Sequence, residues 1–221
     1  MGLVSRVRLR AVGWRPNDRL DADFRCLTTI VRVPEPIGVR IESSLREILD
    51  RWPGHAYYPP ASMHVTVLNL DPYVAADGDE DGEGMVIDRS ADVLGRQRPF
   101  RVMLRGLNVS PWTMFAQVYR ADGPVSAMRA SLRRALHEQT AARRRDSRMR
   151  RALPLVLSNV ARFTSPVDPA LLRAARQRRD HLFGSFNVRE VEIVRTDGFL
   201  SPGATEVLSR VELHPGSPAP A

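Results

Sequence analysis

A histidine and a threonine two residues apart form the pattern in this chain best suited to chemistry. His64-Val65-Thr66 lies within the apolar, β-branched run from Met63 to Leu70, which predicts a strand. Because side chains alternate along a strand, His64 and Thr66 share one face, while Val65 and Val67 face the opposite side. The imidazole can transfer a proton and the hydroxyl can donate to an anionic oxygen. We therefore predict a proton-transfer and anion-binding site on one face of this strand.

The elements around this strand follow from proline and glycine punctuation and from apolar periodicity. Apolar residues at three- and four-residue intervals predict a helix over residues 37–52 and a long helix that begins at residue 122. We also expect a helix over residues 88–94 and one over residues 168–179, which Asp168-Pro169 would cap. Strands are predicted at residues 26–33, 63–70, 100–107, 113–119, 153–163, 187–195 and 206–213. The order strand, proline, helix, loop, strand occurs over residues 27–70 and again over residues 115–163. This weak repeat predicts an α+β, bilobal fold with two antiparallel sheets and flanking helices, related by a pseudo-twofold axis.

Composition limits the function classes. The chain has 221 residues, of which 43% are hydrophobic and 26% are charged, as in ordinary globular proteins. Cys26 is the single cysteine, which excludes an internal disulfide framework, and no apolar run is long enough to span a bilayer. We expect an N-terminal arm over residues 1–24, one domain over residues 25–214, a flexible tail over residues 215–221, and a cytoplasmic location. The formal net charge is +8, and every basic residue is an arginine, which favours polyanionic partners without specifying one.

The order of elements around His-Val-Thr-Val resembles the first lobe of the two-histidine (2H) phosphoesterases. That superfamily includes the 2′,5′ RNA ligase-like proteins and cyclic nucleotide phosphodiesterases. The resemblance covers roughly residues 26–213, with a Pro59-Pro60 loop before the motif and a Phe183-Gly184 turn before the closing strands. It implies one His-x-Thr/Ser motif from each lobe across a central cleft. One histidine would act as base and the other as acid on a phosphodiester held by the two hydroxyls. It implies no metal and no cofactor.

The second motif departs from this pattern. Before Ala161-Arg162-Phe163, which is similar to the end of the family's second motif, the chain has Leu157-Ser158-Asn159. Leu157 cannot transfer a proton, whereas Asn159 can donate a hydrogen bond to a phosphate oxygen and Arg162 can supply charge if it faces the cleft. A missing acid or base typically costs a factor of about 10²–10⁴ in rate. His64 and Thr66 are therefore the candidate catalytic residues, and the expected activity is impaired.

Two loop residues are further candidates. His55 and Tyr57 precede the His64 strand, where they would lie at the lip of the cleft, so we predict that they bind substrate together with Asn159 and Arg162. The alternative is that His55 is a solvated loop residue and that Tyr57 and Tyr58 pack under Pro59-Pro60. The expected ligand is a nucleotide or RNA end with a cyclic or 2′-linked phosphate. We expect no membrane partner, and the oligomeric state stays open.

Three other patterns allow more than one interpretation. The run from Arg143 to Arg151 is either a solvated segment or a clamp for a phosphate backbone. The acidic loop from Asp77 to Gly82 partly matches a calcium-binding template but lacks its final glutamate, which favours a flexible loop. The whole chain could also be a non-catalytic nucleotide- or RNA-binding module of the same fold, or a protein whose arginine run docks an acidic partner.

Overall fold

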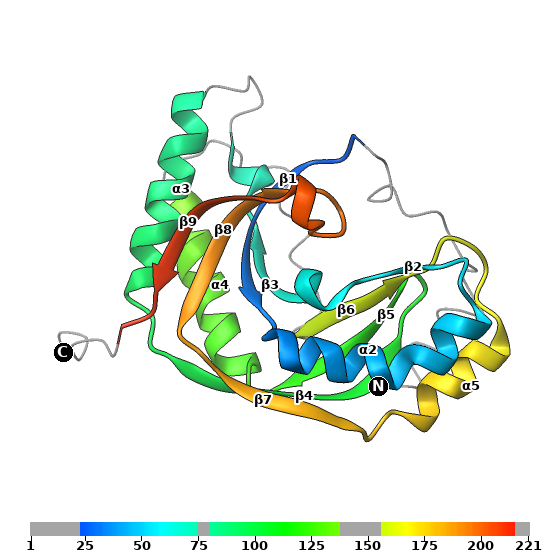
Figure 1. Cartoon of the computed structure of the whole chain (residues 1–221). Coiled ribbons are helices and arrows are strands. Elements are labelled where there is room, and N and C mark those ends of the chain that lie inside the picture. Colours follow the sequence, from blue (N-terminus) through cyan, green and yellow to red (C-terminus); the bar gives the residue numbers. More distant parts are fainter. Residues whose placement is uncertain (1–22, 75–79, 138–155, 215–221) are drawn as a thin grey trace.

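The computed structural model describes residues 23–74, 80–137 and 156–214. Its strands are β1 (Cys26–Arg32), β2 (Ala56–Tyr57), β3 (His64–Asn69), β4 (Phe100–Val109), β5 (Thr113–Tyr119), β6 (Leu157–Arg162), β7 (Leu182–Val188), β8 (Glu190–Thr196) and β9 (Glu206–Glu212). The α-helices are α2 (Glu35–Arg51), α3 (Glu80–Gly95), α4 (Asp122–His137) and α5 (Pro169–Gln177). Short 3₁₀-helices are η2 (Pro60–Ser62), η3 (Asp71–Tyr73) and η5 (Pro202–Ala204). Figure 1 shows their arrangement.

The strands form one nine-stranded antiparallel sheet with the order β7-β4-β5-β6-β3-β1-β8-β9, and β2 pairs with β6. Helices α3 and α4 pack on the half that contains β3, β8 and β9, and helices α2 and α5 pack on the half that contains β4 and β7 (Figure 1). The predicted α+β class with antiparallel strands and flanking helices is thereby confirmed, but the two predicted sheets are joined into one, because β3 pairs with β6. The halves meet where β3 pairs with β6, at Val65 and Ser158.

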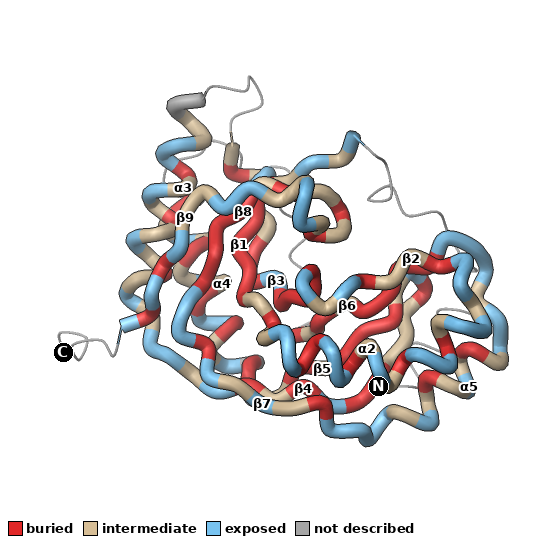
Figure 2. The backbone as a smooth tube through the Cα atoms, viewed as in Figure 1, coloured by how far each residue is buried: buried red, intermediate tan, exposed pale blue. Residues whose placement is uncertain are grey.

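Two helices pack on the half of the sheet that does not contain the strand before them. Helix α2 follows β1 of one half but packs on β7 of the other, and α4 follows β5 but packs on β3. Helix α2 can do this because Ile37, Ile41, Leu45 and Ile48 share one face and are all buried. One continuous core therefore runs beneath both halves, which Figure 2 shows as buried backbone along the strands.

Two elements differ from their sequence-based predictions. Residues 182–188 form strand β7, where the sequence suggested only a turn at Phe183-Gly184. Gly184 lies at a register shift in the pairing with β4, so the predicted turn is a bulge within a strand. Helix α3 begins at Glu80, inside the predicted acidic loop, so residues 80–88 are helical and do not form a calcium-binding loop. Residues 1–22 of the predicted arm, the Arg143–Arg151 run and the predicted tail lie outside the described residues.

Gly106 shows why β4 needs a glycine at its own bulge. Its φ is +75°, which side-chain-bearing residues rarely adopt. A Cβ atom there would lie 2.1 Å from the carbonyl oxygen of Arg179. The close approach lets Gly106 donate its N–H to the carbonyl of His181 and ties the segment after α5 to the edge of the sheet.

Candidate functional site

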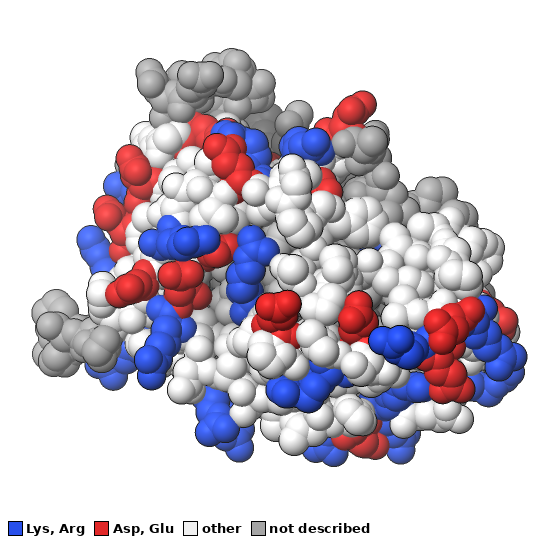
Figure 3. All heavy atoms as spheres, viewed as in Figure 1, with Lys and Arg blue, Asp and Glu red and all other residues white. Residues whose placement is uncertain are grey.

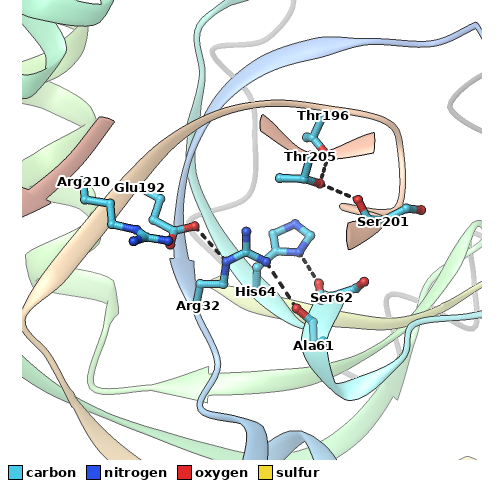
Figure 4. A network of polar contacts seen from close by, with 9 residues as sticks. All are labelled: Arg32, Ala61, Ser62, His64, Glu192, Thr196, Ser201, Thr205 and Arg210. Carbon is cyan, nitrogen blue, oxygen red and sulfur yellow. Dashed lines mark hydrogen bonds and ion pairs between the residues drawn. The ribbon is translucent and has the colours of Figure 1, made fainter. Parts of the chain in front are cut away.

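His64 begins β3, and its imidazole has a hydrogen-bond partner that determines its tautomer. Nδ1 lies 2.8 Å from the carbonyl oxygen of Ser62, at the end of η2. Because a carbonyl only accepts, Nδ1 carries the proton and Nε2 is the nitrogen that can accept one. The side chain is 9% exposed, with the ring of Tyr58 tilted against it at 6.1 Å. The geometry therefore presents His64 as an oriented proton acceptor (Figure 4).

Sheet register places the two motifs side by side. Val65 pairs with Ser158, and both are buried against the helices, so the neighbouring pairs in this antiparallel register are His64 with Asn159 and Thr66 with Leu157. These four side chains lie on the face of the sheet opposite the helices, which we call the open face. Thr66 is exposed, and Leu157 and Asn159 are half-buried. The tertiary structure therefore brings together the two segments that the sequence identified, with Leu157 diagonal to His64.

Asn159 is oriented by strand β5. The hydroxyl of Thr113 shares its proton between Oδ1 of Asn159 at 2.9 Å and the carbonyl of Ala161 at 2.6 Å. The amide nitrogen of Asn159 then remains as a donor on the open face. Phe115 pairs with Asn159 from β5 and is 5% exposed. A phosphate oxygen next to His64 would therefore meet an amide donor at Asn159 and a hydroxyl at Thr66.

A β-bulge places Arg162 on the same face. Strand β5 pairs Met114 with Ala161 and Phe115 with Asn159, so Val160 is an extra residue in β6. The extra residue returns Arg162 to the face of Asn159. Its Nε donates to the hydroxyl of Tyr58 at 2.6 Å and to the carbonyl of Gly198 at 3.1 Å.

The guanidinium of Arg162 is enclosed by aromatic rings. Its central carbon lies 5.7 Å from the ring centroids of both Tyr58 and Phe199, and the residue is 7% exposed. Its two terminal nitrogens make no hydrogen bond within the described part of the chain. Arg162 thus holds the wall of the site through Nε and retains two cationic donor groups.

The wall itself is the turn from Asp197 to Ser201. The Asp197 carboxylate accepts from the backbone N–H groups of Phe199 at 2.9 Å and Ser201 at 3.0 Å. Burial opposes ionisation of Asp197, but hydrogen bonds from Ser201 and Phe199 and the charge of Arg25 outweigh it, so its pKa lies below its usual range.

Leu200 anchors the same turn over β1. It has a left-handed backbone with φ of 56° and is 1% exposed, packed on Ile30 and Val194. A hydroxyl chain continues the wall: Thr196 Oγ1 lies 2.7 Å from Thr205 Oγ1, which donates to the Ser201 carbonyl (Figure 4). Several contacts thus hold an unfavourable backbone conformation beside the candidate site.

Arg32 flanks His64 from the other side. It pairs with His64 in the β1–β3 register, and its Nη1 donates to the carbonyl of Ala61 at 3.2 Å. Its Nε donates to Glu192 Oε2 at 2.7 Å, and Glu192 Oε1 accepts from Arg210 Nε at 3.4 Å. Figure 4 shows the Arg32 guanidinium beside the His64 ring, with Glu192 and Arg210 beyond it.

His55 and Tyr57 do not lie with His64. His55 packs edge-on against the core residue Phe163 with ring centroids 5.1 Å apart; burial lowers its pKa, and its buried Nδ1 has no partner among the described residues. Tyr57 pairs with Ala161 on the helix side, and its hydroxyl donates to the carbonyl of Trp52. Burial raises the pKa of Tyr57 to about 12. Tyr58, which the sequence interpretation left as a packing residue, is the tyrosine that reaches the site.

Sequence reasoning missed the residues that distant strands contribute. Arg32, Glu192 and Arg210 carry no local signal, since each is a single polar residue in an ordinary strand. A signal was available for Tyr58 alone: adjacent residues of an extended segment point to opposite faces, so only one of Tyr57 and Tyr58 can face the site.

Charge on the viewed surface is mixed. In Figure 3 acidic and basic side chains alternate along the β8–β9 side and the lower rim, and a broad uncharged area lies to the upper right of the centre. The net positive charge therefore does not gather into one basic patch on this face. In the described ranges, no three His, Cys, Asp or Glu side chains come close enough to hold a metal ion. None of the described helices is long and apolar enough to cross a membrane.

Comparisons with solved structures agree with this architecture. TT0787 of Thermus thermophilus superposes with a TM-score of 0.63 at 22% identity, covering 86% of this chain and 98% of that one. Escherichia coli LigT complexed with 3′-AMP gives a TM-score of 0.58 at 13% identity over 86% of this chain and 98% of LigT. A protein of unknown function, ATU0111 from Agrobacterium tumefaciens, gives 0.57 at 16% identity and covers 94% of this chain and 96% of its own.

No protein-family model and no curated protein sequence matches the chain. The structural likeness nevertheless extends over nearly the whole length of each neighbour, and another neighbour is described as a phosphoesterase. The resemblance found in the sequence is therefore confirmed at the level of the fold: the chain has the same fold as LigT and TT0787.

Proposed function

We propose that the open face around His64 binds a cyclic or 2′-linked phosphodiester of a nucleotide or an RNA end and transfers protons to or from it without a metal. The single observation that carries this proposal is the pairing of the two motif segments. Register at Val65 and Ser158 brings His64 and Thr66 beside Asn159 on one face. LigT, which shares the fold, has been crystallised with 3′-AMP, phosphate, ATP and NADP⁺, which supports a nucleotide or phosphate ligand here.

The proposed roles follow from the geometry. His64, with Nδ1–H fixed on Ser62, offers Nε2 as the base that accepts a proton from an attacking hydroxyl or water. The new bond forms between that oxygen and phosphorus, and the bond from phosphorus to the leaving ribose oxygen breaks. The Thr66 hydroxyl and the Asn159 amide donate to the phosphate oxygens, and the terminal nitrogens of Arg162 add positive charge.

The leaving oxygen lacks a dedicated proton donor. Leu157 occupies the position, diagonal to His64, where the second histidine of the 2H pattern would stand. The leaving oxygen therefore takes its proton from solvent. We therefore propose slow turnover, lower by about 10²–10⁴ than with a complete acid–base pair.

The second candidate function is a phosphate-reading module without turnover, and Leu157 is the observation that favours it. In that case the ligand binds to the same donors and leaves unchanged.

The test is a turnover and binding assay with 2′,3′-cyclic nucleotides and RNA that ends in a 2′,3′-cyclic phosphate, in the presence of a chelator. We expect ring opening that is lost in His64→Ala and kept in His181→Ala, a histidine outside the site. Binding without turnover, unaffected by His64→Ala, would support the module instead. If the protein shows no binding and no turnover with these ligands, both functions are overturned.

A further inference from the structure

Three charged residues that join one another in ion pairs lie beyond His64. Arg32 lies on the open face because it pairs with His64. Ile30 pairs with both Thr66 and Glu192, and Glu192 pairs with Arg210, so Glu192 and Arg210 lie on the same face. The strand order β3-β1-β8-β9 sets them out in one direction from His64. They therefore continue the candidate site along the sheet.

Glu192 forms an ion pair with the Nε atom of both Arg32 and Arg210. Its side chain is 7% exposed, whereas those of Arg32 and Arg210 are 33% and 63% exposed. Each arginine meets the carboxylate through Nε, at 2.7 Å and 3.4 Å. Nη1 of Arg32 donates to the Ala61 carbonyl. The other terminal nitrogens of Arg32 and Arg210 make no hydrogen bond within the described part of the chain, so they can bind other partners.

Charge and shape then define the ligand. Two guanidinium groups and one carboxylate leave a net charge of +1 beside a wall that already holds Arg162. Guanidinium forks match the oxygens of a phosphate and bind them in pairs. Arg32 lies on β1, the strand next to His64, and Arg210 lies on β9, three strands from His64. The Arg210 side chain reaches back to Glu192 on β8, whose carboxylate also binds Arg32, so both guanidinium groups adjoin one carboxylate. A ribonucleotide carries phosphates on both sides of its ribose, so one can lie at His64 while the other meets these guanidinium groups.

We infer that Arg32 and Arg210 form a subsite for a second phosphate of the ligand, the one on the 5′ side of the nucleotide whose cyclic phosphate lies at His64. This inference rests on the proposed function and narrows its substrate class. The preferred ligand is an RNA end or a 5′-phosphorylated nucleotide, and a nucleoside cyclic phosphate without the second phosphate binds more weakly.

The chain supplies a matched control. Arg105 and Arg179 also share one carboxylate, that of Asp180, at 3.4 Å and 3.2 Å. Asp180 is 69% exposed there, and the three residues lie on β4 and on the segment between α5 and β7. A general effect of surface charge would respond to Arg179→Gln as strongly as to Arg210→Gln.

The experiment compares adenosine 2′,3′-cyclic phosphate with its 5′-phosphorylated form by isothermal titration and by kcat/KM. In the unmodified protein we expect the 5′-phosphate to raise affinity by at least about tenfold, from charge-assisted hydrogen bonds. In Arg210→Gln the ratio between the two ligands should fall toward one, in Arg210→Lys it should be intermediate, and in Arg179→Gln it should stay at the wild-type value. Melting temperatures verify that each variant folds.

Any of three results would overturn the inference while leaving the proposed function in place. The first is equal affinity for both ligands in the unmodified protein. The second is an unchanged affinity ratio in Arg210→Gln, and the third is an equal loss of that ratio in Arg179→Gln. Absence of binding by both ligands would instead remove the proposed function together with the subsite.

Discussion

Restoring a proton-transfer group at Leu157 should convert this site into a faster catalyst. Leu157 pairs with Thr66 in the register set by Val65 and Ser158, which makes it the diagonal neighbour of His64 on the open face. Diagonal neighbours across an antiparallel pair are about 7–8 Å apart, enough for two imidazoles to stand on either side of one phosphorus. Leu157 is half-buried, so a histidine there keeps contact with water.

The expected gain follows from what the missing group would supply. A positioned general acid contributes about 10²–10⁴ in rate, which corresponds to a barrier lower by about 3–5 kcal/mol. We expect Leu157→His to raise kcat for ring opening of 2′,3′-cyclic nucleotides by at least about 10². Because Asn159 already offers an amide donor, Leu157→His/Asn159→Thr should add less than a further factor of about ten.

The assay uses the same cyclic nucleotides, with chelator, at saturating ligand. Leu157→Gln serves as the control, since it introduces polarity of similar size at the same position without a group that titrates near neutral pH. His64→Ala in the Leu157→His background should abolish most of the gain, because the second group acts only with the first. A folded Leu157→His protein that is no faster than Leu157→Gln would show that the phosphate does not lie between these two positions.

Three further predictions concern the supports of the site, each read from unfolding in denaturant. Arg162→Met should lower the unfolding free energy by about 2 kcal/mol and Tyr58→Phe by about 1 kcal/mol, because both remove hydrogen bonds to a buried partner. If the two losses add up in the double variant, Arg162 and Tyr58 are not directly coupled. His55 has a lowered pKa in the folded state, so the unfolded chain binds its proton first, and its contribution to stability is present above pH 6.5 and declines as the pH falls below that value. His55→Phe should therefore flatten the change in stability between about pH 7.5 and 5.5, and an unchanged slope would rule out His55 as its source. Gly106→Ala should destabilise the protein by more than about 2 kcal/mol, because a Cβ would overlap a carbonyl oxygen at a left-handed φ. Gly95→Ala, where the Cβ would meet only one atom at 3.8 Å, should be tolerated. Equal melting temperatures for these two variants would refute this account.

The turn from Asp197 to Ser201 explains how the site can be rigid without a second histidine. Its backbone is held by the Asp197 carboxylate and by Leu200 buried on β1, and its Gly198 carbonyl accepts from Tyr58 and Arg162. Preorganised donors of this kind can stabilise a charged ligand even where proton transfer is weak. This arrangement suits slow catalysis and tight phosphate binding equally, which is why the turnover assay decides between them.

Local sequence determined much of this protein. Period-two alternation alone places His64 and Thr66 on one face and Val65 on the other, and the structure has them so. Apolar spacing and the proline before the helix predict α2, and Asp168-Pro169 predicts the start of α5, where Asp168 caps the helix through the Ala170 N–H. These features depend on residues within a turn or two of each other, so the chain itself carries their signal.

Only the tertiary structure decided which other residues join His64. A bulge at Val160 turns Arg162 onto the open face, although alternation from Asn159 predicts the other side. The pairing of β2 with β6 sends Tyr57 to the helices and leaves Tyr58 for the site. Arg32 meets both His64 and Glu192 because β1 pairs with both β3 and β8, strands that lie far apart in the chain. Register and strand order arise from the packing of the whole core, and no local pattern of residue types encodes them.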